Sequence, residues 1–163
     1  KEYGVKWISL MPTNLYGPRD NFDLQGSHVL PALIRRFVEA VENGSGKVTL
    51  WGSGSPKREF LHVNDLAQAV LITSEKYDSP MHLNIGSGSD LTIKDLAGKV
   101  ATAAGFTGDI DWDKSKPDGT PQKVLDVSKI KALGWEPTIT LEEGIASTIT
   151  WYKEASTQGK VRK

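Results

Sequence analysis

Two polar side chains of this sequence lie beside turn-forming residues, where they are free to meet a ligand. Arg58 follows the glycine-rich stretch Gly52–Pro56, and its planar guanidinium can bind a diphosphate through two parallel hydrogen bonds. The alternative is a solvated surface arginine paired with Glu59. Asp118 lies in the loop Lys116–Pro121, and a carboxylate accepts hydrogen bonds, for example from ribose hydroxyls or from the N–H edge of guanine. The alternative there is an ordinary Asp-Gly turn.

His28 is the candidate for proton transfer. Ser27 is a good N-cap for a helix over residues 28–43, which would place His28 at the helix N-terminus. The positive end of the helix dipole favours a neutral imidazole, able to exchange protons near neutral pH. A structural role for a histidine at a helix cap is the alternative. His62 and His82 lie in apolar strand segments and are predicted to be structural.

A strand followed by a polar loop predicts a place for a cofactor. The run Lys6–Met11 is short and apolar, which predicts a buried parallel strand. The next residues, Pro12–Pro18, hold two prolines and a glycine and predict a turn. Ligands of open α/β sheets bind where strands end at their carboxyl side. An ordinary exit from a strand into a loop is the alternative.

The rest of the chain predicts an α/β fold. Further strands are predicted over residues 47–51, 59–62, 82–85 and 110–113, and helices over 64–77, 93–104, 128–133 and 141–155. The predicted core positions of the first two helices are Leu30, Ile34, Phe37 and Val41, and Leu66, Ala69, Val70 and Thr73. Asn64 and Thr92 are the predicted caps of the second and third helices. Trp51 ends a strand, where its flat ring can pack against a ligand, although a lone tryptophan more commonly belongs to the core. The polar tail after Ser156 is expected to fray.

Composition excludes several classes of function. The chain has 163 residues, 38% of them apolar, with 20 basic and 20 acidic side chains. This is one domain's worth of sequence, and its zero net charge indicates neither a nucleic-acid nor a membrane partner. It contains no cysteine, and its scattered histidines predict no metal site. No apolar run reaches the roughly 20 residues of a membrane span, and no signal peptide opens the chain, so we expect a cytoplasmic protein.

Four segments together resemble one protein family. Met11–Pro18, Ser27–Pro31, Val48–Ala67 and Lys116–Pro121 resemble, in this order, the C-terminal half of an extended short-chain dehydrogenase/reductase. The pairing of Ser-His-Val with Ser-Lys-Pro-Asp-Gly-Thr-Pro is similar to the GDP-L-fucose synthase branch. The resemblance runs from about Val5 to Trp151. It implies the last strands of a Rossmann-type parallel sheet plus a small α/β substrate-binding domain.

The resemblance also implies an activity and a set of site residues. The branch is made of NADPH-dependent epimerase-reductases that turn GDP-4-keto-6-deoxy-D-mannose into GDP-L-fucose, as homodimers. A cysteine and a histidine move protons during two epimerisations, and NADPH then reduces the ketone. The histidine maps onto His28, which also contacts the cofactor NADP(H). Further cofactor contacts map onto Pro12, Thr13, Asn14 and Leu15, and contacts with the GDP-sugar map onto Arg36, Trp51, Arg58 and Asp118.

Other parts of the family's machinery are missing from this sequence. There is no Gly-x-x-Gly-x-x-Gly loop and no Tyr-x-x-x-Lys pair, both of which lie in the family's N-terminal NADP-binding half. The resemblance implies that residues 5–26 and 60–88 contribute to the dinucleotide-binding sheet and residues 27–59 and 89–155 form the substrate domain. The chain alone is expected to be inactive. Two alternatives remain open: another NAD(P)-dependent nucleotide-sugar epimerase or dehydratase, and a non-catalytic nucleotide-sugar-binding protein of the same fold.

Overall fold

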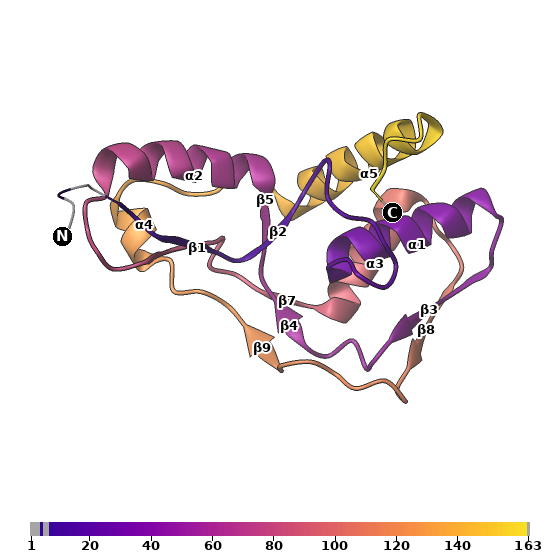
Figure 1. The fold of residues 1–163 in the computed structure, drawn as a ribbon. Helices are drawn as coiled ribbons and strands as arrows, with labels where there is room; N and C mark the ends of the chain where they lie inside the picture. Colours follow the sequence, from indigo (N-terminus) through magenta and orange to yellow (C-terminus); the bar gives the residue numbers. More distant parts are fainter. Residues whose placement is uncertain (1–3, 5–6, 163) are drawn as a thin grey trace.

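The computed structural model describes residue 4 and residues 7–162, and it has the alternating helices and strands of an α/β protein (Figure 1). The strands are β1 (Leu10–Pro12), β2 (Asn14–Tyr16), β3 (Lys47–Trp51), β4 (Lys57–Arg58), β5 (Phe60–His62), β6 (Leu83–Ile85), β7 (Leu91–Thr92), β8 (Asp109–Asp113) and β9 (Gln122–Lys123). The helices are α1 (Val29–Glu42), α2 (Val63–Lys76), α3 (Ile93–Ala104), α4 (Ser128–Ala132) and α5 (Leu141–Thr157).

Short parallel strand pairs join segments that are far apart in the sequence. β1 pairs with β6, β2 with β5, and β3 with β8, all in parallel. β4 lies between β7, which is antiparallel to it, and β9, which is parallel. Parallel neighbours need crossover connections, which here contain helices. The predicted α/β fold class with parallel strands is confirmed.

Two hydrophobic clusters hold these elements together. The larger one packs α1, α3 and α5 against one another, with Ile34 and Phe37 of α1 fully buried. Burying a side chain of this size stabilises the fold by roughly 1.5–3 kcal/mol. The smaller cluster joins α2, β6 and α4 and includes Leu83 and Ile130. In Figure 1 the α2–α4 group lies at one end of the molecule and the α1–α3–α5 group at the other.

Several predicted elements are confirmed at their ends. The third helix spans Ile93–Ala104 as predicted, capped by the Thr92 hydroxyl, which accepts from the Asp95 amide, and ended by Gly105 at φ 82°. Strand β3 also has the predicted bounds. Leu30, Ile34 and Phe37 are buried as predicted. These features depend on local sequence, which explains why the pattern alone predicted them.

The predicted strand Lys6–Met11 is wrong in position and burial. Lys6 lies outside the described residues, β1 starts only at Leu10, and Trp7 and Met11 are 79% and 51% exposed. The expected turn at Pro12–Pro18 instead contains β2. Pro12 is tolerated because it ends the short ladder with β6, and the chain then changes partner to β5.

Other expectations failed because tertiary contacts overrode local pattern. α1 is capped by His28 rather than Ser27, and α2 by the His62 ring nitrogen Nδ1, which accepts from the Asn64 amide at 3.3 Å. Val41 and Val70 are 38% and 43% exposed rather than buried. The tail is not frayed throughout: the Phe22 amide donates to the carbonyl of Arg162 at 2.9 Å. That bond gives the polar tail a partner its own sequence does not reveal.

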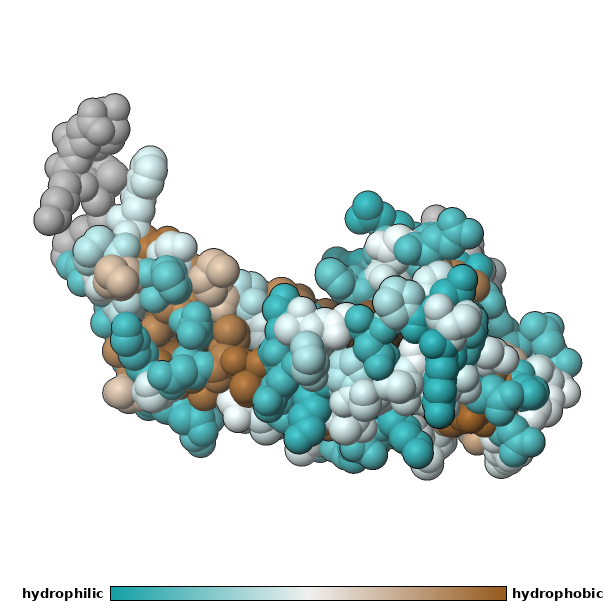
Figure 2. Space-filling model, turned by 90° about the horizontal axis from the view of Figure 1, so that it is seen from below, coloured by the Kyte–Doolittle hydropathy of each residue, from teal (hydrophilic) through white to brown (hydrophobic). Residues whose placement is uncertain are grey.

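Apolar side chains gather on one part of the surface. Figure 2 shows them over the end of the molecule that carries α2 and α4, while the end with α1, α3 and β8 is mostly polar on this face. The exposed large apolar residues near α2, β1 and α4 include Trp7, Met11, Val63, Val70, Leu71, Met81 and Val124. A patch of this kind typically marks a contact surface. In the described part of the chain, no helix combines the length and apolar character that crossing a bilayer would require.

Candidate functional site

A cavity of about 900 Å³ opens beside the ends of β1 and β2. Its lining includes Pro12–Leu15, His28 and the segment Gln122–Leu125, which come from three distant parts of the sequence. Its size falls in the range typical of small-ligand sites. The structure therefore brings together all five residues for which the sequence predicted cofactor contacts.

The Glu59 backbone carbonyl holds the side chains of Thr13, between β1 and β2, and of Asn14, the first residue of β2. The Asn14 side-chain amide donates to the carbonyl of Glu59 at 2.8 Å, and the Thr13 hydroxyl donates to the same oxygen at 3.3 Å. The Thr13 amide donates to the Ile85 carbonyl at 2.9 Å. The polar groups of both side chains are thus already engaged by the backbone of Glu59.

His28 also lines this cavity. It is the N-cap residue of α1, it is exposed, and its ring makes no hydrogen bond within the described residues. An exposed imidazole at a helix N-terminus is available to a ligand for proton exchange. The neighbouring Ser27 hydroxyl is buried and has no partner among the described residues.

Arg58 and Asp118 meet in a second region, at the loop between β3 and β4. Asp118 accepts hydrogen bonds from the Ser53 amide at 2.9 Å and from the Ser53 hydroxyl at 2.6 Å. These bonds lower the pKa of Asp118 below its usual value, and the bond from the Ser53 hydroxyl has the larger effect. Arg58 donates to the carbonyl of Thr120 at 2.6 Å. The 118–120 loop is therefore fastened to strand β4 and to the β3–β4 loop at once.

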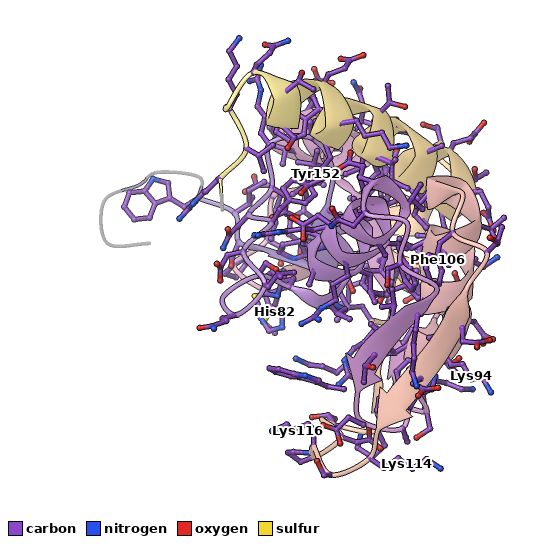
Figure 3. All side chains as sticks on the ribbon, turned by 90° about the vertical axis from the view of Figure 1, so that its right-hand side faces the viewer. His82, Lys94, Phe106, Lys114, Lys116 and Tyr152 are labelled. Atoms are coloured by element: carbon purple, nitrogen blue, oxygen red, sulfur yellow. The ribbon has the colours of Figure 1, made fainter. Side chains whose placement is uncertain are left out.

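Trp51 completes this second region. It is 62% exposed at the end of β3, and the Lys116 ammonium lies 5.9 Å from its ring centre. Figure 3 shows Lys114 and Lys116 at the far tip of this region, well away from Tyr152 and Phe106 in the helical part. The alternative that Trp51 belongs to the core is therefore wrong, because a core tryptophan is buried. An exposed aromatic face beside a cation is a surface on which a planar ligand can stack.

The two adjacent arginines of α1 have different surroundings. Arg35 donates to the Glu39 carboxylate at 2.8 Å and to the Phe22 carbonyl at 3.2 Å, so it has a structural task. Arg36 has no hydrogen bond or ion pair within the described residues. Of the two, Arg36 is therefore the one whose guanidinium is not engaged within the described residues, and its contact with a GDP-sugar stays a prediction.

Apart from His28, which lines the same cavity as Pro12–Leu15, and Arg36 on α1, the site residues form two groups. We call the first the inner wall, made of Pro12–Leu15, Glu59 and Gly86–Gly88, and the second the outer rim, made of Trp51, Ser53, Arg58 and Asp118. The residues for which substrate contacts were predicted do not line the cavity at the inner wall. Arg58 and Glu59 are adjacent in the chain and so join the two groups.

Two buried carboxylates were missed by the sequence analysis. Glu59 is 0% exposed and does not pair with Arg58; it accepts from the Gly88 amide at 2.7 Å and from the Leu125 amide at 2.9 Å. Asp65 is 2% exposed and accepts from the Thr138 amide and hydroxyl and from the Ile139 amide. An acidic residue inside an apolar run, as in Glu59-Phe-Leu, was the available signal, because buried carboxylates need several donors.

Among the residues that the structure describes, no three histidine, cysteine, aspartate or glutamate side chains lie close enough together to hold an ion.

Comparison with known proteins identifies the family. Residues 1–86 match the model of the NAD dependent epimerase/dehydratase family, and the chain belongs to this family.

Among its relatives the chain is similar to GDP-L-fucose synthases. It is 55% identical to Probable GDP-L-fucose synthase 1 of Oryza sativa subsp. japonica, over 94% of this chain and 47% of that protein. It is 48% identical to GDP-L-fucose synthase of Escherichia coli, over 94% and 51%. The structure of a GDP-L-fucose synthetase from Naegleria fowleri bound to NADP matches with a TM-score of 0.88 at 33% identity, over 96% of this chain and 49% of that one. The chain thus spans about half the length of the curated relatives it matches.

Proposed function

We propose that this chain is the C-terminal, sugar-nucleotide-binding portion of an NADPH-dependent enzyme that makes GDP-L-fucose from GDP-4-keto-6-deoxy-D-mannose. The observation that carries the proposal is the shared cavity of Pro12–Leu15 and His28, because it puts a proton-exchanging imidazole at the predicted cofactor loop. The identity of 48–55% to GDP-L-fucose synthases supports it. Alone, the chain is expected to be inactive, since it lacks a Tyr-x-x-x-Lys pair.

The inner wall fits the nicotinamide end of NADP(H). Strands β1 and β2 end beside a cavity of about 900 Å³, and the polar side-chain groups of Thr13 and Asn14 are occupied by hydrogen bonds to the Glu59 carbonyl. A ring can therefore lie close to the backbone there. The sequence has no Gly-x-x-Gly-x-x-Gly loop for the diphosphate of the cofactor, and the proposal assigns that contact to the other half of the enzyme. When bound, NADPH supplies the hydride that reduces the ketone.

The outer rim fits the nucleotide of a GDP-sugar. Arg58 offers guanidinium donors to the diphosphate, and Arg36 adds a second cation. Trp51 offers an exposed ring face. Both oxygens of Asp118 already accept hydrogen bonds from Ser53, so it acts first by closing the loop and then, through its remaining lone pairs, on ribose or guanine donors.

His28 is assigned to the epimerisations. A proton leaves a carbon beside the ketone of the sugar, and a new proton arrives on the opposite face. The His28 imidazole gives or takes one of these protons at a ring nitrogen, and a group outside this chain handles the other. General acid catalysis of this kind contributes a factor of roughly 10²–10⁴ in rate.

The proposal extends to the organisation of the whole enzyme. Residues 5–26 and 60–88 would belong to its dinucleotide-binding sheet and residues 27–59 and 89–155 to its substrate domain. The apolar patch near α2 would be covered by the N-terminal half. The enzyme would be a cytoplasmic homodimer. The alternatives, an enzyme for UDP- or dTDP-sugars and a non-catalytic binding protein, predict respectively a different substrate and no turnover.

Solvent-deuterium incorporation tests this function in the full-length enzyme. The His28→Gln variant keeps a polar side chain of similar size at the start of α1. We expect it to bind NADPH and the GDP-sugar almost normally, while deuterium incorporation at the epimerised carbons falls by at least 100-fold, within the range expected for losing a general acid. Parental rates of incorporation and of GDP-L-fucose formation in the variant would show that His28 is only a helix cap. No turnover of the keto sugar by the unsubstituted enzyme would refute the proposed activity.

A further inference from the structure

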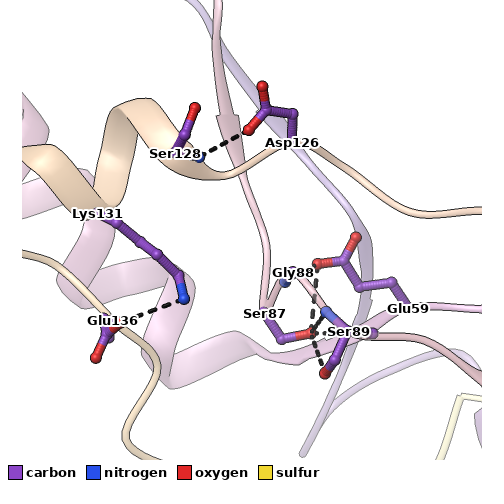
Figure 4. Close-up of polar contacts among 8 residues, drawn as sticks. All are labelled: Glu59, Ser87, Gly88, Ser89, Asp126, Ser128, Lys131 and Glu136. Atoms are coloured by element: carbon purple, nitrogen blue, oxygen red, sulfur yellow. Dashed lines mark hydrogen bonds and ion pairs between the residues drawn. The ribbon is translucent and has the colours of Figure 1, made fainter.

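Glu59 lies between the inner wall and the outer rim, and both its backbone carbonyl and its side-chain carboxylate accept hydrogen bonds. Its carbonyl accepts from Thr13 and Asn14 of the predicted cofactor loop. Its carboxylate accepts from the Gly88 amide, from the Ser87 hydroxyl at 3.3 Å and from the Leu125 amide. Figure 4 shows the carboxylate reaching Ser87 and Gly88. The preceding residue is Arg58.

The space around this carboxylate is shaped to it. Glu59 is fully buried, and a Cβ added at Gly86 would overlap its Oε1 atom. Each carboxylate oxygen has at least one N–H donor, and the two donors, Gly88 and Leu125, lie on separate segments of the chain. Removing an acceptor here leaves buried donors without partners, which is the costly outcome in a low-dielectric interior.

We propose that Glu59 is a positioning residue that fixes the cofactor loop and Arg58 relative to each other. The affinities for NADP⁺ and for GDP then both depend on Glu59, although it touches neither ligand. This inference rests on the proposed function. The chain between Arg58 and the Glu59 carbonyl is a single residue long, so any displacement of the buried carboxylate moves the loop at Thr13 and Asn14 together with the Arg58 guanidinium. A buried carboxylate with a merely structural task would stabilise the fold without changing the affinity of the folded protein for ligands.

The chain offers a matched control in Asp65. It is also a buried carboxylate with three hydrogen-bond donors, but these lie on Thr138 and Ile139, outside both the inner wall and the outer rim. Glu59→Gln and Asp65→Asn each replace one acceptor oxygen by an amide nitrogen of the same size. Both variants should lose thermal stability to a similar degree, because each leaves one buried N–H or O–H facing a donor.

The experiment measures binding of NADP⁺ and of GDP to the full-length enzyme by calorimetry. We expect Glu59→Gln to raise both dissociation constants about tenfold, and Asp65→Asn to leave both within twofold. In an Arg58→Ala background, the effect of Glu59→Gln on GDP should shrink to less than threefold, while its effect on NADP⁺ stays near tenfold. Dissociation constants within twofold of the parent in Glu59→Gln, or an undiminished effect on GDP without Arg58, would overturn the inference.

A milder pair keeps the test decisive if Glu59→Gln does not fold. Ser87→Ala removes one donor to Glu59, and Ser89→Ala removes only a neighbouring hydroxyl. We expect Ser87→Ala to weaken both ligands two- to threefold and Ser89→Ala to weaken neither; equal affinities in the two variants would count against Glu59. If the unsubstituted enzyme bound neither ligand, the proposed function would fall first and this inference with it.

Discussion

The inner wall and the outer rim are both fixed by carboxylates, yet the two carboxylates differ in surroundings. Glu59 is fully buried and holds backbone amides of two segments and, through its carbonyl, the β1–β2 loop. Asp118 is exposed and holds only Ser53. A buried acceptor is expensive to remove, whereas water replaces an exposed one at little cost. The inner wall therefore behaves as part of the fold, and the outer rim as a surface that can change without unfolding the protein.

The largest expected difference concerns two glycines that touch these carboxylates. In Gly86→Ala the added methyl would overlap Glu59, and in Gly52→Ala it would overlap Asp118. We expect Gly86→Ala to destabilise the protein by about 3 kcal/mol, because the added methyl group and the Glu59 carboxylate have no room to move apart in the packed interior. Gly52→Ala should cost only about 1 kcal/mol, mostly for its left-handed backbone at φ 79°, since the exposed Asp118 can swing away. Chemical denaturation measures both; equal losses would erase the distinction between the regions.

A second, intermediate effect should separate ligand binding from stability at the outer rim. Arg58→Ala is expected to weaken GDP binding in the full-length enzyme by about 10- to 100-fold, the equivalent of about 1.5–3 kcal/mol for a charge-assisted contact. The melting temperature should change little, because the carbonyls of Lys57 and Thr120 that Arg58 bonds can turn to water. Lys57→Ala is the control, since Lys57 is an exposed cation on the same strand. A GDP affinity in Arg58→Ala equal to that in the control would show that Arg58 is a surface charge with no contact to GDP.

The smallest effect is a difference in pH dependence between His62, at the end of β5, and Asp118 of the outer rim. Burial lowers the pKa of His62, and the nearby Asp65 only partly offsets this. The neutral ring therefore contributes stability that is fully present above its unfolded pKa of about 6.5 and is lost as the pH falls below that value. Asp118 at the outer rim also has a lowered pKa, so its loop stays closed until the pH falls below the ordinary aspartate range.

His62→Asn tests the pH prediction with the cap preserved. Asparagine is a good N-cap for α2 and does not titrate. Between pH 7 and pH 5 the variant should lose less unfolding free energy than the parent, as measured by urea denaturation at several pH values. His82→Asn, an exposed histidine, serves as the control. Parallel curves for the parent and His62→Asn would mean that burial of the His62 ring does not matter for acid stability.

The sequence by itself determined the α/β class, most helix boundaries and the identity of the residues that could bind a ligand. Thr92 and Gly105 predicted both ends of α3, because caps are local chemistry. The side-chain types of His28, Arg58 and Asp118 likewise predict proton exchange, anion binding and hydrogen-bond acceptance, because these capacities belong to the side chain itself.

Only the tertiary structure decided which of these residues meet and what holds them. Asn14 and Glu59 are 45 residues apart in the chain, and Glu59 and Leu125 are 66 apart, so no local pattern predicts their hydrogen bonds. The strand at Leu10–Pro12 was likewise fixed by its partner β6 rather than by its own apolar run. The sequence gives the type of each side chain directly, but burial and pairing result from the packing of distant segments. Burial is the property that distinguishes Glu59 from Asp118.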